Sequence, residues 1–147
     1  VRLFLSNPLT EKISYDIYRN ALRHLAGAEK LALDFLDHAP EPPDPAKLVY
    51  GQAIHHREAP QALADGQADV AVVFHHLAVR YRRIFPNLFE FVRPAAWVQD
   101  HDEMVGRCDY GLVGDGGKWG GQLVDFLETD AVTKIYQGHG LERVLLR

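Results

Sequence analysis

Three junctions between a predicted strand and a predicted helix carry the residues of this chain that are best suited to chemistry. They span residues 6–15, 54–58 and 74–76. In open α/β sheets, ligands bind beyond the carboxyl ends of the strands, where the N-termini of helices converge. Each N-terminus offers unpaired N–H donors and about half a positive charge, which suits an anion. Ser14 adds a hydroxyl at the first junction, or it simply caps the helix.

Two histidine pairs, His55-His56 and His75-His76, mark the other two junctions. Imidazole and carboxylate groups are common metal ligands. However, neither pair has the i, i+4 spacing of a zincin helix, and adjacent histidines on a strand point to opposite faces. We therefore expect no metal site. Instead, we expect each pair to lie at the rim of a cleft, with one of its histidines hydrogen-bonded and the other in solvent. Arg57 could bind a ligand, whereas we expect Glu58 to pair with neighbouring groups of its helix.

Other motifs give no sign of an enzyme. The stretch Gly114–Gly117 lacks the spacing and the Lys-Ser/Thr ending of a nucleotide-binding loop, which predicts a turn. Ser6, Ser14 and Cys108 have no base at a recognisable spacing, so no specific motif indicates a hydrolase. We expect no catalytic activity and no cofactor. The single cysteine cannot form an internal disulfide bond.

The elements that position these junctions follow from hydrophobic patterns along the chain. Strands are predicted at Arg2–Ser6, Lys47–Ile54, Asp69–Phe74, Leu88–Val92 and Tyr110–Val113, and helices at Ser14–Leu25, Arg57–Asp65, His75–Arg83, Trp119–Leu127 and Ala131–Gln137. Predicted boundary residues are Gly27 and Gly66 after helices, Pro60 in a first helical turn, and Thr129 or Asp130 as a cap. The alternation of predicted strands and helices along the chain predicts an α/β fold with a mainly parallel sheet flanked by helices.

Composition narrows the class of protein further. With 147 residues the chain suits one domain, and 47% hydrophobic and 24% charged residues are ordinary for a globular protein. The net charge of −4 disfavours a nucleic-acid partner, which would require a basic face. The longest apolar run, Val70–Phe74, is far too short to span a membrane. Because Val1–Leu5 already has the pattern of a strand, we expect a fragment or a processed product.

The string Arg57–Gly66, followed by Gln67–Phe74, resembles a segment of type II periplasmic solute-binding proteins, closest to their molybdate- and tungstate-binding branch. Two further stretches resemble segments of the same family and occur in the same order along the chain. Leu5–Leu25 resembles the strand, Asn-Pro turn and helix that open the second lobe of that family. Phe126–Asp130 with Ile135–Leu141 resembles its closing signature. The resemblance therefore extends over nearly the whole chain.

This resemblance implies a periplasmic-binding-protein-like lobe. Residues 1–113 would form the second lobe of a two-lobe clamshell, and residues 114–147 a closing helical segment that packs on a first lobe absent from this chain. The implied function is the periplasmic solute-binding component of an ABC-type uptake system, which delivers an oxyanion to a membrane permease. The alternative is the ligand-sensing domain of a transcription regulator with the same fold. Without a first lobe, we expect the closing segment to form a homodimer or to repack.

The resemblance also implies the ligand contacts. In the molybdate-binding proteins the second lobe supplies backbone N–H donors from two helix N-termini and one tyrosine hydroxyl, and these positions fall on Ser14, His56 and Phe74. Since Phe74 has no hydroxyl, the identity of the anion stays open, and His56, Arg57 or His75 would have to replace that donor. The expected ligand-binding residues are Ser14, Tyr15, His56, Arg57, Phe74 and His75.

Overall fold

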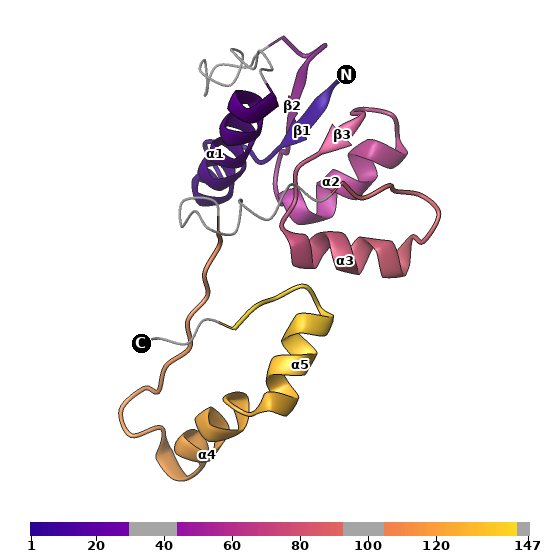
Figure 1. The fold of residues 1–147 in the computed structure, drawn as a ribbon. Helices are drawn as coiled ribbons and strands as arrows, with labels where there is room; N and C mark the ends of the chain where they lie inside the picture. The colour runs from indigo at the N-terminus through magenta and orange to yellow at the C-terminus, as the bar shows by residue number, and fades with distance from the viewer. Residues whose placement is uncertain (30–43, 93–104, 144–147) are drawn as a thin grey trace.

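The computed structural model describes residues 1–29, 44–92 and 105–143. Within these ranges the chain forms three strands and five helices (Figure 1). The strands are β1 (Leu3–Leu5), β2 (Leu48–Tyr50) and β3 (Val70–Ala71), and the helices are α1 (Lys12–Glu29), α2 (His55–Ala64), α3 (His75–Ile84), α4 (Gly117–Leu127) and α5 (Asp130–Gly138). Up to α3 every strand is followed by a helix, which confirms the predicted α/β class. None of the described helices is long and apolar enough to cross a membrane.

The three strands form one parallel sheet in the order β2-β1-β3, so β1 is the central strand. Leu3 of β1 pairs with Leu48 on one side and with Val70 on the other, and Leu5 pairs with Tyr50. All three residues of β1 are buried, as expected for a strand that is covered on both faces. The parallel arrangement that the sequence predicted is therefore confirmed.

Helix α1 covers one face of this sheet. Leu3 and Leu5 pack there against Tyr15 and Tyr18 of the helix. The two tyrosines are three residues apart, which places them on the same side of a helix. Both are almost fully buried, with 2% and 3% of their surface exposed. This face of the core is therefore built from leucines of the sheet and phenol rings of the helix.

Helix α2 covers the opposite face, where Phe4 packs against Ala59, Ala62 and Ala68. Successive residues of a strand point to opposite faces, so Phe4 points away from its two neighbours in β1. The alanines leave room for the ring between helix and sheet. Burying a side chain of this size stabilises a fold by about 1.5–3 kcal/mol.

The turn into α1 is built by Asn7, whose side-chain Oδ1 accepts a hydrogen bond from the Leu9 backbone at 2.9 Å. The helix begins two residues before the predicted start, so Ser14 is its third residue. Gly27 lies inside the helix, and the prediction that it ends α1 is wrong. A glycine within a helix costs only about 1 kcal/mol, so a helix held by its packing on the sheet continues through it.

Helix α2 ends as predicted. Gly66 has a φ of 68°, and its N–H donates to Leu63 O at 3.1 Å, while the Gln67 N–H donates to Ala62 O at 2.8 Å. This pair of bonds is the Schellman motif. Pro60 is the sixth residue of α2 because the helix begins earlier than predicted. Its placement in the first turn was therefore wrong, and the helix lacks one internal hydrogen bond there.

All five predicted strands are shorter in the structure than predicted or absent from it, and Lys47–Ile54 is reduced to β2. The strand predicted over Asp69–Phe74 is reduced to β3, followed by a 3.4 Å bond from Val72 N to Phe4 O. Residues 88–92 and 110–113 form no strand, so both predictions are wrong. A strand needs a neighbouring strand to satisfy its backbone. Residues 110–113 instead belong to a segment that runs by itself from the sheet to α4 (Figure 1).

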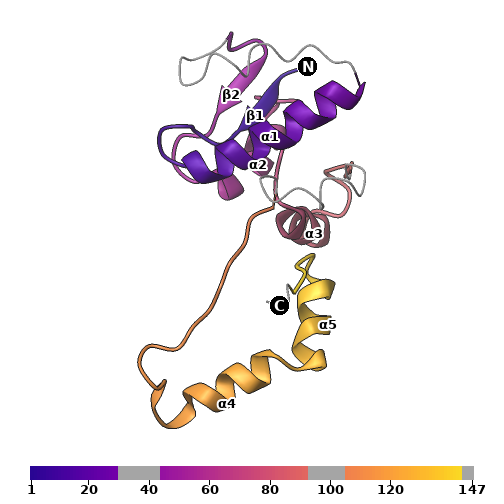
Figure 2. The same ribbon diagram turned by 60° about the vertical axis from the view of Figure 1, so that its left-hand side comes forward.

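Helices α4 and α5 form an arm, residues 117–138, that stands apart from the sheet (Figure 2). Its far end returns to α3, where Arg83 Nη2 donates to Gly138 O at 2.5 Å. Next to this bond the backbone of Gly140 lies directly against His75 and His76, since a Cβ atom there would come within about 3 Å of both. The arm is therefore joined to the sheet domain through the first and last turns of α3.

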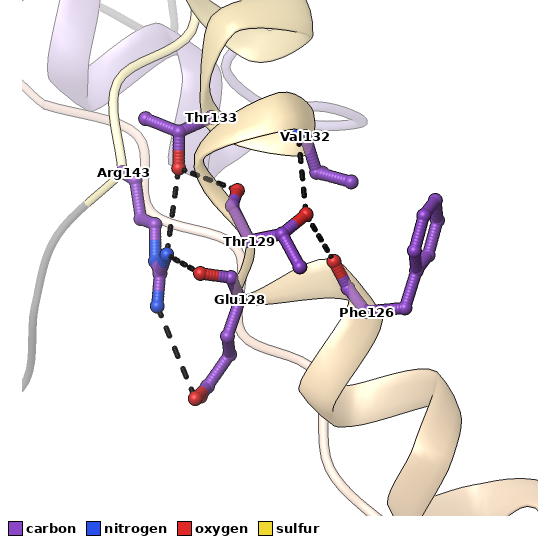
Figure 3. Close-up of polar contacts among 6 residues, drawn as sticks. All are labelled: Phe126, Glu128, Thr129, Val132, Thr133 and Arg143. Atoms are coloured by element: carbon purple, nitrogen blue, oxygen red, sulfur yellow. Dashed lines mark hydrogen bonds and ion pairs between the residues drawn. The ribbon is translucent and has the colours of Figure 1, made fainter.

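Within the arm, Thr129 confirms its predicted role as the cap of α5 (Figure 3). Its Oγ1 accepts from Val132 N at 3.4 Å and donates to Phe126 O at 2.8 Å. Arg143, which follows α5, donates to the backbone oxygen of Glu128 and lies 4.0 Å from its carboxylate. These bonds fix the bend between the two helices.

We expect Gly66→Ala to lower the free energy of unfolding by about 1–2 kcal/mol, because an L-residue is strained in the left-handed region. No atom would contact the added methyl group, so backbone strain is the only cost. Gly121→Ala in α4 is the matched control: it has equal space and no positive φ, and should stabilise by about 0.5–1 kcal/mol. Urea unfolding of both variants measures the difference, and equal effects would contradict the Schellman assignment.

Candidate functional site

The three parallel strands end at one edge of the sheet, which we call the carboxyl edge. It comprises Ser6 after β1, Tyr50 and Gly51 at the end of β2, and residues 72–74 after β3. Gly51 N donates to Leu5 O at 2.9 Å, which fixes the first two of these segments side by side. Helices α1, α2 and α3 each begin shortly after one of these segments, as required for a ligand site in an open α/β sheet.

Two of these helices begin without a side-chain cap. The N-cap residues are Ile54 for α2 and Phe74 for α3, and neither side chain makes a capping hydrogen bond. Apolar residues are unfavourable at this position because they cannot accept from the first backbone N–H groups. The positive ends of α2 and α3 therefore have no acceptor from their own caps, and an external anion could take that place.

The Glu58 side chain binds backbone N–H groups just before α2. Its Oε2 accepts from Gln52 N at 2.8 Å and its Oε1 from Ala53 N at 3.0 Å. The carboxylate thus closes the loop between β2 and α2 onto the first turn of the helix. These partners of Glu58 are therefore backbone groups of the preceding loop and not the helix neighbours that the sequence predicted.

The predicted ligand residues come from three different helices. Ser14 is half-buried in the first turn of α1, while Tyr15 lies in the core. Arg57 in the first turn of α2 and His75 at the start of α3 are exposed. The side chain of His56 lies outside the described part of the structure. The starts of all three helices follow the carboxyl edge of the sheet.

Phe74 is engaged in packing. Its ring lies 4.9 Å from that of Tyr18 and is stacked on His76 at 5.9 Å. The backbone of Gly106 closes the third side, since a Cβ atom there would come within 3.0 Å of the Phe74 ring. This position therefore offers a ligand an apolar ring and no hydroxyl.

The phenol of Tyr18, which belongs to α1, nevertheless lies next to Phe74. Burial raises the pKa of Tyr18 well above its ordinary value, and a hydrogen bond from the Phe74 backbone opposes that rise. The Tyr18 hydroxyl of α1 thus lies beside the backbone of Phe74, the N-cap of α3. The sequence placed Tyr18 only within the predicted helix Ser14–Leu25, and its three-residue spacing from Tyr15 was the available signal.

Three hydroxyl groups at or next to the carboxyl edge have no hydrogen-bond partner in the part of the chain that the structure describes: those of Ser6, Tyr15 and Tyr50. Ser6 is fully buried, and Tyr15 is 2% exposed. A buried hydroxyl without a partner costs about 1–3 kcal/mol. Ser6 and Tyr50 are the residues that the sequence analysis did not select as ligand contacts, because only the sheet register brings them to one edge.

A metal centre has no support in the described residues, where no group of three or more His, Cys, Asp and Glu side chains is placed to hold an ion. Cys108 is exposed and free. His76 is stacked on Phe74, while His75 faces solvent at the start of α3. Within this part of the chain the site therefore offers hydroxyl, ring and backbone N–H groups together with the exposed side chains of Arg57 and His75.

Comparison with known proteins yields no relative: no protein-family model, curated protein or solved structure matches this chain.

We expect the free energy of unfolding to fall as the pH rises above about 10, the ordinary pKa of tyrosine. Burial raises the pKa values of Tyr18, Tyr50 and Tyr81 in the folded state. The folded protein therefore keeps these protons longer than the unfolded chain, so their contribution is complete below pH 10 and is lost above it.

Urea unfolding between neutral pH and pH 11 measures this slope, and Tyr18→Phe should make it shallower. The same variant should lose about 1 kcal/mol at neutral pH with its hydrogen bond. An unchanged slope would show that the Tyr18 hydroxyl is not buried.

Proposed function

We propose that this chain is an oxyanion-binding lobe of a periplasmic solute receptor, which works with a membrane ABC permease and carries out no catalysis. The observation that carries the proposal is the pair of uncapped helices, α2 and α3, at the carboxyl edge of a parallel sheet. The buried hydroxyls of Ser6 and Tyr15 support it, because they are donors without acceptors. The resemblance of Arg57–Phe74 to the molybdate- and tungstate-binding branch agrees with this placement.

In this proposal the anion is held by backbone N–H groups at the starts of α2 and α3, with Arg57 as the nearest cation of the first turn. Each charge-assisted hydrogen bond contributes about 1.5–3 kcal/mol. The Glu58 carboxylate, bound to the Gln52 and Ala53 backbone, already occupies two N–H donors of the loop beside the site.

We expect molybdate, tungstate or another tetrahedral oxyanion to raise the melting temperature of this chain in proportion to the logarithm of its concentration. Sodium chloride at equal ionic strength is the control for general salt effects. Arg57→Ala should reduce the shift, whereas Arg82→Ala, an exposed arginine in the last turn of α3, should not. If sulfate, phosphate, molybdate and tungstate all leave the melting temperature unchanged, the proposal is wrong.

The arm presents an apolar face that needs a partner. Trp119, Leu123 and Phe126 recur at i, i+4 and i+7 on α4 and are 62%, 55% and 57% exposed. Lys118 and Asp125 flank this stripe on the same side, seven residues apart. In an antiparallel pair of α4 helices, the lysine of each copy would face the aspartate of the other.

We therefore expect this chain to form a homodimer through α4, visible by light scattering during size exclusion. Phe126→Glu should dissociate it, because the charge would be buried at the centre of the interface. Gln137→Glu adds the same charge on an exposed position of α5 and should leave the dimer intact. A monomer of 16.6 kDa at all concentrations would refute this interface.

A further inference from the structure

The hydroxyl groups of Ser6, Tyr15 and Tyr50 come from three separate elements. Ser6 follows β1, Tyr15 belongs to α1 and Tyr50 ends β2. Their oxygen atoms are buried, and none of them has a hydrogen-bond partner within residues 1–29, 44–92 and 105–143. Buried polar groups in folded proteins are almost always paired, so several at one place need an explanation.

The two phenols lie next to each other. Their rings meet edge to face, with centroids 6.0 Å apart and an interplanar angle of 75°. The hydroxyls are near enough for Tyr15 to add to the effect of burial in raising the pKa of Tyr50, yet neither hydroxyl has a hydrogen-bond partner of ordinary distance and angle among the described residues. Two donors are therefore held side by side without a well-placed acceptor.

The sheet register brings Ser6 to the same region. Tyr50 is paired with Leu5, the residue immediately before Ser6, and Gly51 N donates to Leu5 O. Because these two strands are central and edge strands of one parallel sheet, Ser6 and Tyr50 cannot be separated without breaking the ladder. The hydroxyl pair and Ser6 are thus fixed before any ligand arrives.

A positive charge lies beside the phenol pair. The Arg19 guanidinium lies over the Tyr15 ring, 5.7 Å from its centroid, and its Nε is also buried without a hydrogen-bond partner among the described residues. One of its other nitrogen atoms lies 3.3 Å from the Asp16 carboxylate, so the cation is only partly neutralised. Neutral hydroxyl donors beside a cation suit an acceptor with negative charge.

We propose that Ser6, Tyr15 and Tyr50 form a hydroxyl subsite that donates hydrogen bonds to the oxygen atoms of a small oxyanion bound at the carboxyl edge. This inference rests on the proposed function and adds the protein's own donors to it. Phenylalanine would fill the place of either tyrosine without leaving a buried hydroxyl unpaired. The hydroxyls therefore lower the stability of the empty protein and gain their partners when the anion binds.

The test uses Tyr15→Phe and Tyr50→Phe, with the exposed Tyr110→Phe as the matched control. Melting temperatures are measured without ligand and with molybdate or sulfate, whichever stabilises the wild-type chain more. Without ligand, Tyr15→Phe should melt at a higher temperature than the wild type. With the anion, both variants should bind about tenfold more weakly, as expected for one lost hydrogen bond, while Tyr110→Phe should bind like the wild type.

The outcomes separate the two proposals. If the wild type is stabilised by an anion and both phenylalanine variants bind it equally well, the subsite is wrong and the oxyanion-binding function stands. A lower melting temperature of ligand-free Tyr15→Phe would also overturn the subsite, since its hydroxyl would then be bonded within the protein. If no anion stabilises the wild type, the proposed function and the subsite fail together.

Discussion

The burial of β1 between two helices is the constraint on which the rest of the structure depends. This strand is only Leu3–Leu5, yet it pairs with both other strands, and its side chains alternate between the α1 and α2 faces. Each of its residues therefore belongs to a core cluster. Since β2 and β3 contact no other strand in the described sheet, removing β1 would leave no ladder at all.

The same constraint creates the candidate site. A central strand delivers the residue after it into the interior, so Ser6 is fully buried while its hydroxyl has no partner. The tyrosines of α1 reach this edge because the helix packs along β1 from the turn at Asn7. Stability and ligand binding make opposite demands here: the packing that secures the fold also removes water from hydroxyls that the protein leaves unpaired.

The arm has a different kind of attachment. Its described link to the sheet domain is a polar contact between Arg83 and the end of α5, with the Gly140 backbone against the start of α3. The apolar stripe of α4 is not used in that contact. An arm held by its tip, with its apolar side exposed, can pack on a second surface, as the proposed dimer requires.

The sequence alone determined the α/β class, the parallel sheet, the approximate position of every described helix, the boundary role of Gly66, and a cap of α5 at either Thr129 or Asp130. These features depend on local periodicity and local backbone geometry. Only the tertiary structure decided that residues 88–92 and 110–113 are not strands, since a strand exists only where another strand can pair with it. It also decided the composition of the candidate site. Tyr15 and Tyr50 are far apart in sequence and meet because β2 pairs with β1 and α1 packs on both. No local pattern contains that contact, so the unpaired hydroxyls became visible only when the chain was folded.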